Sequence, residues 1–130
     1  MDEKQLVRIA FEAMENAAAP YSKFPVGAAL LAKSGRVYKG ANVESSSYGL
    51  SMCAERVALF KALSEGERDF TAIAIATTAS RACPPCGACR QLLWDYARDI
   101  DVYISENKNT YQKYNIRDFF PFPFDSEFLD

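Results

Sequence analysis

Apolar residues recur along the chain with two different periods, and each change of period marks the boundary of a predicted element. Over 2–18 they recur at helical spacing, and Pro20 then ends this predicted helix. The aliphatic run at 26–32 is followed by a turn at 34–35 and a return segment at 36–42, which is typical of a β-hairpin. The chain is therefore expected to open with one helix and two antiparallel strands.

The next three segments are predicted to be a loop, a helix and a buried strand. Residues 43–52 have the composition of a loop, whereas the apolar residues of 53–65 favour a helix that Gly66 ends. Residues 70–77 are apolar on both faces, which is the pattern of a central strand covered by helices on both sides.

After a pair of prolines, the pattern predicts another helix at 86–97 and a short strand at 101–105. This alternation of helices and strands predicts an α/β layered domain with a mixed sheet. Because no linker or repeat interrupts the pattern, we expect a single domain over 1–130. Prolines break the aromatic segment 119–124, so no regular element is expected there. An exposed run of this kind favours burial against another subunit or a substrate.

Composition and charge narrow the set of partners. The chain has 130 residues and a net charge of −2, which argues against nucleic acid as a partner because phosphate binding needs a basic excess. No apolar stretch has the length of a membrane span, and the start at residues 1–4 does not resemble a signal peptide. We therefore expect no membrane partner and a cytoplasmic location, where clustered cysteines are more often metal ligands or catalytic groups than disulfides.

The chain contains no histidine, and this absence limits its chemistry. Nucleophile pairs that depend on imidazole are excluded. Any general base must be a carboxylate, lysine, tyrosine or cysteine, and any zinc site must be built from sulfur and oxygen.

Two short segments carry the candidate chemistry. Cys53, Cys86 and Cys89 offer three thiolates, a set that holds zinc and leaves its fourth position free for water. Glu55 stands two residues from the first of them, where a carboxylate can move that water's proton. Arg56 could donate to the thiolate sulfurs and withdraw charge from them. The pattern is that of a hydrolytic site.

Other interpretations of the cysteines stay open. Each cysteine taken alone could be a small buried apolar residue. With Cys83 as a fourth ligand, the site would be a closed structural zinc site, and Cys83 with Cys86 could also form a redox pair. Neither of these two sites needs Glu55.

Six segments of the chain together resemble the cytidine deaminases, specifically the small homotetrameric class with three cysteine ligands. A ligand-x-Glu motif followed by Pro-Cys-x-x-Cys is the signature of zinc-dependent nucleobase deaminases. The matching segments are 53–56, 85–91, 21–30, 42–44, 48–49 and 121–124, in the expected order, with Arg90-Gln91 closing the second motif.

The resemblance implies a fold and an activity. The fold is a three-layer sandwich with a mixed central sheet of about five strands. The activity is the zinc-dependent hydrolytic deamination of cytidine and deoxycytidine to uridine and deoxyuridine, with release of ammonia, in pyrimidine salvage. One Zn²⁺ per subunit and a homotetramer whose subunits share their sites are also implied.

The resemblance also implies a role for each matching residue. Cys53, Cys86 and Cys89 hold zinc, and Glu55 shuttles protons between the water, the ring N3 and the leaving ammonia. Phe24 is implied to stack on the pyrimidine, and Asn42 and Glu44 to form hydrogen bonds with the ribose 3′-hydroxyl. The backbone of Ala54 would contact the base carbonyl, and the carbonyl of Pro84 would accept a hydrogen bond from the exocyclic amine. The residues implied to reach the sites of neighbouring subunits are Ser46, Tyr48 and Phe124.

Four residues depart from the family pattern. Pro84 replaces a serine or threonine but keeps its carbonyl, Ser45-Ser46 replaces Asn-Ala, and Cys83 has no role in the pattern. The rival functions are a deaminase for another cytosine nucleoside such as blasticidin S and a structural zinc module that uses all four cysteines. Editing of RNA or DNA is disfavoured because the sequence shows no basic track for a strand.

Overall fold

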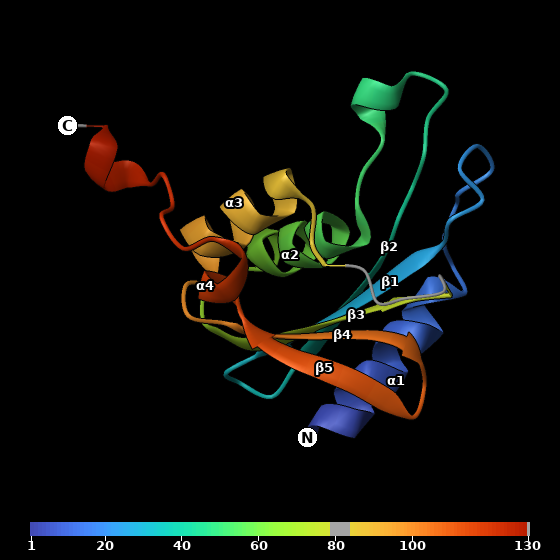
Figure 1. Ribbon diagram of the computed structural model, residues 1–130, viewed down its shortest axis with the longest axis horizontal. Helices are drawn as coiled ribbons and strands as arrows, with labels where there is room; N and C mark the ends of the chain where they lie inside the picture. The colour runs from blue at the N-terminus through green and yellow to red at the C-terminus, as the bar shows by residue number, and fades with distance from the viewer. Residues whose placement is uncertain (79–83, 130) are drawn as a thin grey trace.

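The computed structural model describes residues 1–78 and 84–129 (Figure 1). Five strands form one sheet in the order β2-β1-β3-β4-β5, with β3 and β4 parallel and every other neighbouring pair antiparallel. The elements are α1 (Glu3–Met14), β1 (Val26–Ala32), β2 (Val37–Ala41), α2 (Ala54–Ser64), β3 (Phe70–Thr77), α3 (Gly87–Tyr96), β4 (Asp101–Asn107), β5 (Thr110–Asn115) and α4 (Ile116–Phe119), with short 3-10 helices η1 (Tyr48–Leu50) and η2 (Ser126–Phe128).

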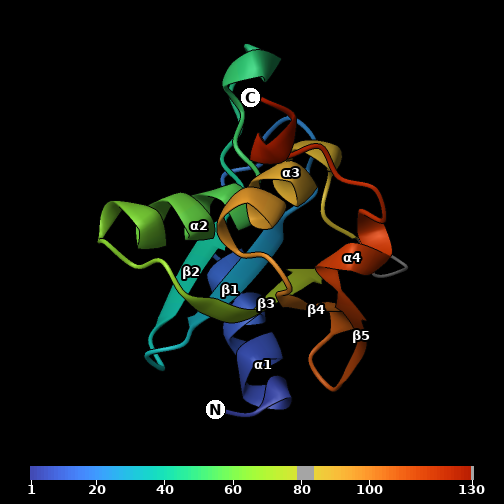
Figure 2. The ribbon, with the colours of Figure 1, turned by 90° about the vertical axis from the view of Figure 1, so that its left-hand side faces the viewer.

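Helices cover both faces of the sheet, so the predicted three-layer α/β fold and its mixed five-stranded sheet are confirmed. Helix α1 packs on one face, and α2 and α3 lie on the other (Figure 2). The central strand β3 serves both layers. Its alanines, such as Ala74, belong to the core beneath α1, whereas Ile73 and Ile75 belong to the core beneath α2 and α3. This division explains why 70–77 is apolar on both faces.

The structure corrects the sequence prediction after residue 105. Strand β4 continues to Asn107 and turns into β5, which the sequence pattern missed because most of its side chains are polar and it forms the edge of the sheet. Helix α4 was also missed, and it begins with a capping box formed by Asn115 and Asp118. The prediction of no regular element at 119–124 is therefore wrong at Phe119, which ends α4 and packs against the core.

Two further boundaries differ from the prediction. Helix α1 ends at Met14 rather than at residue 18, because Ala18 leaves the helix to form a bridge with Val43. Val43 also pairs with Met52, so the predicted loop at 43–52 is closed at its base and carries η1 near its tip. The loop rises well above the sheet in Figure 1.

The C-terminal segment is fastened to α3 by side chains of that helix. The hydrogen bonds that hold the segment run from Arg90 Nη1 to the Phe119 carbonyl (2.7 Å), from Gln91 Nε2 to the Phe124 carbonyl (2.8 Å) and from Trp94 Nε1 to Asp125 Oδ2 (3.2 Å).

Among the described residues, none of the helices has the length and apolar character needed to cross a bilayer.

Candidate active site

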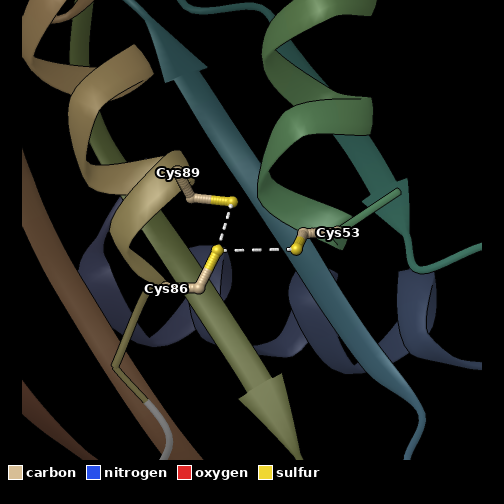
Figure 3. A group of neighbouring side chains, drawn as sticks. All are labelled: Cys53, Cys86 and Cys89. Carbon is tan, nitrogen blue, oxygen red and sulfur yellow. Dashed lines mark hydrogen bonds between the residues drawn. The ribbon is translucent and has the colours of Figure 1, made fainter. Parts of the chain in front are cut away.

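Three cysteine sulfurs meet where two helices begin (Figure 3). Cys53 is the N-cap residue of α2 and Cys86 that of α3, as the sequence predicts, and Cys89 lies in the first turn of α3. The Sγ atoms of Cys53 and Cys86 are 3.6 Å apart, and those of Cys86 and Cys89 are 3.4 Å apart. All three sulfurs lie within 4.8 Å of one another.

This geometry fits a zinc ion. A tetrahedral site with Zn–S bonds of about 2.3 Å separates its sulfurs by about 3.8 Å, which is close to the two distances measured here. Within 1–78 and 84–129, the group of potential metal ligands consists of these three cysteines. Cys83 lies outside the described residues, so the four-thiolate alternative stays open.

Positive and polar groups around the sulfurs favour a thiolate at Cys53. The neighbouring Cys89 thiol and the Arg56 guanidinium hold the pKa of Cys53 down at about 5. The Arg56 guanidinium donates from Nη2 to Cys53 Sγ over 3.4 Å, which is the contact expected from the sequence. The proximity of Cys53 and burial raise the pKa of the Cys89 thiol. The arrangement places negative charge at the start of α2, where the helix dipole also favours it.

Glu55 is buried beside this charge. Only 5% of its surface is exposed, and burial, together with the nearby Cys53 thiolate, raises the pKa of the Glu55 carboxyl to about 7. A carboxyl group that titrates near neutral pH can both accept and return a proton, which is the property that general acid–base chemistry requires.

A cavity of about 560 Å³ opens onto Cys53, Cys86 and Glu55. It brings together most of the sequence-predicted substrate residues from three separate parts of the chain. Those that line it are Phe24, Asn42, Glu44, Ala54 and Pro84, beside Cys53, Cys86, Glu55 and Arg56.

Sequence reasoning missed five residues of the cavity wall. Ser22 and Val26 flank Phe24 in the 21–30 motif, and Met52 precedes the first cysteine, so motif position is a signal that could have identified them. Ile75 lies inside a strand, where nothing in the sequence separates it from its core neighbours. The missed residues are Ser22, Val26, Ser51, Met52 and Ile75.

Ser46 and Phe124, two of the predicted residues, do not line the cavity within the described part of this chain. Ser46 lies in the raised 43–52 loop, and Tyr48 begins η1 in the same loop. Phe124 is 54% exposed, and its ring stacks on Phe128 at a centroid distance of 5.6 Å. Their contacts with neighbouring subunits stay predictions.

Glu44 organises the loop that presents Phe24 to the cavity. Its Oε1 accepts from the backbone N–H groups of Tyr21 (3.1 Å) and Ser22 (3.0 Å), and its Oε2 accepts from the Ser22 hydroxyl. These bonds hold the pKa of the Glu44 carboxyl below its ordinary value. Ser22 Oγ in turn accepts from the Phe24 N–H over 3.0 Å, so the carboxylate is linked to the Phe24 backbone through one hydroxyl.

Asn42 fastens the other end of this loop. Its Oδ1 accepts from the Val26 N–H and its Nδ2 donates to the Phe24 carbonyl, both over 2.9 Å. Since Asn42 is 9% exposed, these two bonds satisfy a side chain that is largely withdrawn from water. The sequence prediction gave Asn42 and Glu44 a role toward a ligand and did not foresee this one.

The Ser22→Ala change tests the link between Glu44 and Phe24. Losing a hydrogen bond worth about 1 kcal/mol should make the Phe24 amide exchange with solvent deuterium about fivefold faster. The matched control is Ser34→Ala, which removes a hydroxyl that donates to Glu67 over 2.6 Å in the β1–β2 turn, away from the cavity. An unchanged Phe24 exchange rate in Ser22→Ala would show that the hydroxyl does not order the loop.

Comparisons with known proteins give a consistent answer. The family model of the cytidine and deoxycytidylate deaminase zinc-binding region matches residues 1–105. Cytidine deaminase of Halalkalibacterium halodurans is 48% identical over 128 residues, covering 98% of this chain and 97% of that protein. That of Sporosarcina psychrophila is 42% identical over 130 residues, covering 99% and 96%. The crystal structure of cytidine deaminase from Burkholderia pseudomallei superposes with a TM-score of 0.92 at 41% identity, covering 95% of this chain and 100% of that one.

Proposed function

Because this chain belongs to the cytidine and deoxycytidylate deaminase family, we propose that it deaminates cytidine to uridine by zinc-dependent hydrolysis and releases ammonia. The observation that carries the proposal is the cavity of about 560 Å³ whose wall combines cysteine sulfurs with the buried carboxyl of Glu55. Deoxycytidine is proposed as a second substrate, and the proposed role is pyrimidine salvage in the cytoplasm. Residues 1–130 are proposed to act as one domain.

Cys53, Cys86 and Cys89 are the proposed ligands of one zinc ion per chain, supported by the spacing of their sulfurs. A zinc ion bound there lowers the pKa of its water and so supplies a nucleophile near neutral pH. Arg56 offsets part of the negative charge of the thiolates through its contact with Cys53.

Glu55 is the proposed proton shuttle. Its carboxylate takes a proton from the attacking water and delivers it to N3 of the ring as oxygen bonds to C4. It then takes the proton of the new hydroxyl and gives it to the exocyclic amine, which leaves as ammonia while the C4 carbonyl forms. The raised pKa of the Glu55 carboxyl, about 7, supports a group that serves first as base and then as acid.

The proposed substrate contacts come from the loops that meet at the cavity. Phe24 stacks on the pyrimidine, Ala54 meets the base carbonyl through its backbone, and the carbonyl of Pro84 accepts from the amine. Asn42 and Glu44 bind the ribose 3′-hydroxyl. Their existing bonds allow this, because the amide keeps a second N–H and a second lone pair, and the carboxylate oxygens keep further lone pairs.

A homotetramer is proposed as the working form, with Ser46, Tyr48 and Phe124 entering the sites of neighbouring subunits. Their positions support this assembly. The 43–52 loop and the C-terminal segment both extend away from the sheet (Figure 1), and Phe124 and Phe128 expose apolar rings.

The proposed activity is tested by following the ultraviolet absorbance of cytidine with purified protein, before and after treatment with a zinc chelator. Activity should disappear with the chelator and return with added zinc.

Glu55→Gln should retain zinc yet lose at least about 10²-fold in kcat, a typical contribution of general acid–base catalysis. Glu65→Gln, which alters the exposed pair with Arg36 at the far end of α2, is the matched control and should remain active. Full activity of Glu55→Gln would exclude the shuttle role. If the unaltered protein deaminates blasticidin S but not cytidine, the rival substrate is correct and the proposed one is wrong.

The number of cysteine ligands is tested by zinc content. Cys89→Ser should lose stoichiometric zinc, because it removes one sulfur of a three-ligand set that has no spare member. Cys83→Ser should keep both zinc and activity. Loss of zinc from Cys83→Ser, measured by elemental analysis after dialysis, would instead support a closed four-thiolate site.

The contribution of the C-terminal segment to a neighbouring site is tested with two phenylalanines. Phe124→Ala should raise the KM for cytidine about tenfold, the size expected for one lost aromatic contact, with a smaller change in kcat. Phe122→Ala is the matched control, because Phe122 is 89% exposed and has no proposed substrate contact. Equal KM values in the two variants would contradict the proposed contact.

A further inference from the structure

We propose that Gly40 is a positioning residue for the zinc-binding end of α2, an inference that rests on the proposed zinc site. Gly40 lies in β2, where α2 crosses the strand at very close range. A Cβ atom at this position would lie 2.4 Å from the Ala54 carbonyl oxygen and 2.5 Å from the Ala58 backbone nitrogen. Both atoms belong to the backbone, so no change of side-chain rotamer can relieve the overlap.

The contact falls at the part of the helix that carries the chemistry. Ala54 stands between Cys53 and Glu55, and Ala58 follows one turn later. All three atoms nearest to the Gly40 position belong to Ala54 and Ala58. The bare backbone of Gly40 therefore sets how close the first turn of α2 lies to the sheet.

The distance involved is large on the scale of a metal site. Restoring an ordinary contact of 3.4 Å would move the Ala54 carbonyl by about 1 Å, whereas a metal site tolerates about 0.2 Å in its ligand distances. Cys86 and Cys89 are carried by α3. A displacement of α2 changes the distance from Cys53 to these two sulfurs, and it moves Glu55 as well.

Gly27 offers a matched control on the other face of the sheet. It lies in β1, and a Cβ there would lie 2.0 Å from the Ala10 carbonyl oxygen and 2.5 Å from the Met14 nitrogen, both in α1. The steric conflict is at least as severe as at Gly40. Helix α1 carries none of the proposed zinc ligands, so the two glycines separate a general packing effect from an effect on the metal site.

The experiment compares Gly40→Ala with Gly27→Ala by zinc affinity, measured in competition with a chelating dye, and by the sulfur-to-cobalt charge-transfer spectrum of the Co²⁺-substituted protein. Gly40→Ala should bind zinc at least about tenfold more weakly and shift the cobalt band. Gly27→Ala should keep the affinity and spectrum of the unaltered protein even if its melting temperature falls as far. Ala58→Ser, which enlarges a fully buried residue whose backbone contacts Gly40, replaces Gly40→Ala if that variant does not fold and should change both readouts in the same direction.

The outcomes separate this proposal from the proposed function. If the unaltered protein binds zinc and deaminates cytidine but Gly40→Ala and Ala58→Ser leave the zinc affinity and cobalt spectrum unchanged, the positioning role is wrong. It is also wrong if Gly27→Ala alters both readouts as strongly as Gly40→Ala. Failure of the unaltered protein to bind zinc would instead overturn the proposed zinc site itself.

Discussion

The structure depends on two helix starts that meet at one end of the sheet and direct sulfur atoms at each other. Serine, threonine, aspartate and asparagine are the usual N-cap residues, and each stabilises a helix by about 1 kcal/mol through its side chain. Cys53 and Cys86 occupy the N-cap positions of α2 and α3 without any side-chain cap bond. The chain therefore gives up capping at both positions, and the sulfurs are free to serve as ligands. This local departure from helix-forming rules is the kind that marks functional sites.

The same convergence determines how charge is distributed. Thiolates beside a buried carboxyl would repel one another strongly if all were ionised. Cys89, Arg56 and the start of α2 lower the pKa of Cys53, whereas burial raises the pKa of the Glu55 carboxyl on the same turn. Negative charge is thus favoured on sulfur, whereas the neighbouring carboxyl can gain or lose a proton near neutral pH.

How much of this could be predicted depends on the range of the interactions. The period of apolar residues identified β3 and the starts of α2 and α3, because burial on both faces and helical spacing are local signals. Strand β5 was missed because an exposed edge strand shows no clear apolar alternation. The cysteine spacing and Glu55 pointed to the metal site. The link from Glu44 through Ser22 to Phe24 joins residues about 20 positions apart, and no local pattern encodes such a contact.

The cavity consequently has two walls that are held in place by different interactions. The sulfur wall is held by backbone packing against the sheet, where Gly40 admits no extra atom beneath α2. The opposite wall, formed by Phe24 and its neighbours, is held by side-chain hydrogen bonds from Asn42 and Glu44, each worth about 1 kcal/mol. Close packing resists displacement steeply, whereas single hydrogen bonds are exchanged at small cost. Substitutions in the loops are therefore expected to displace Phe24 more readily than substitutions in the sheet displace the sulfur atoms at the helix starts.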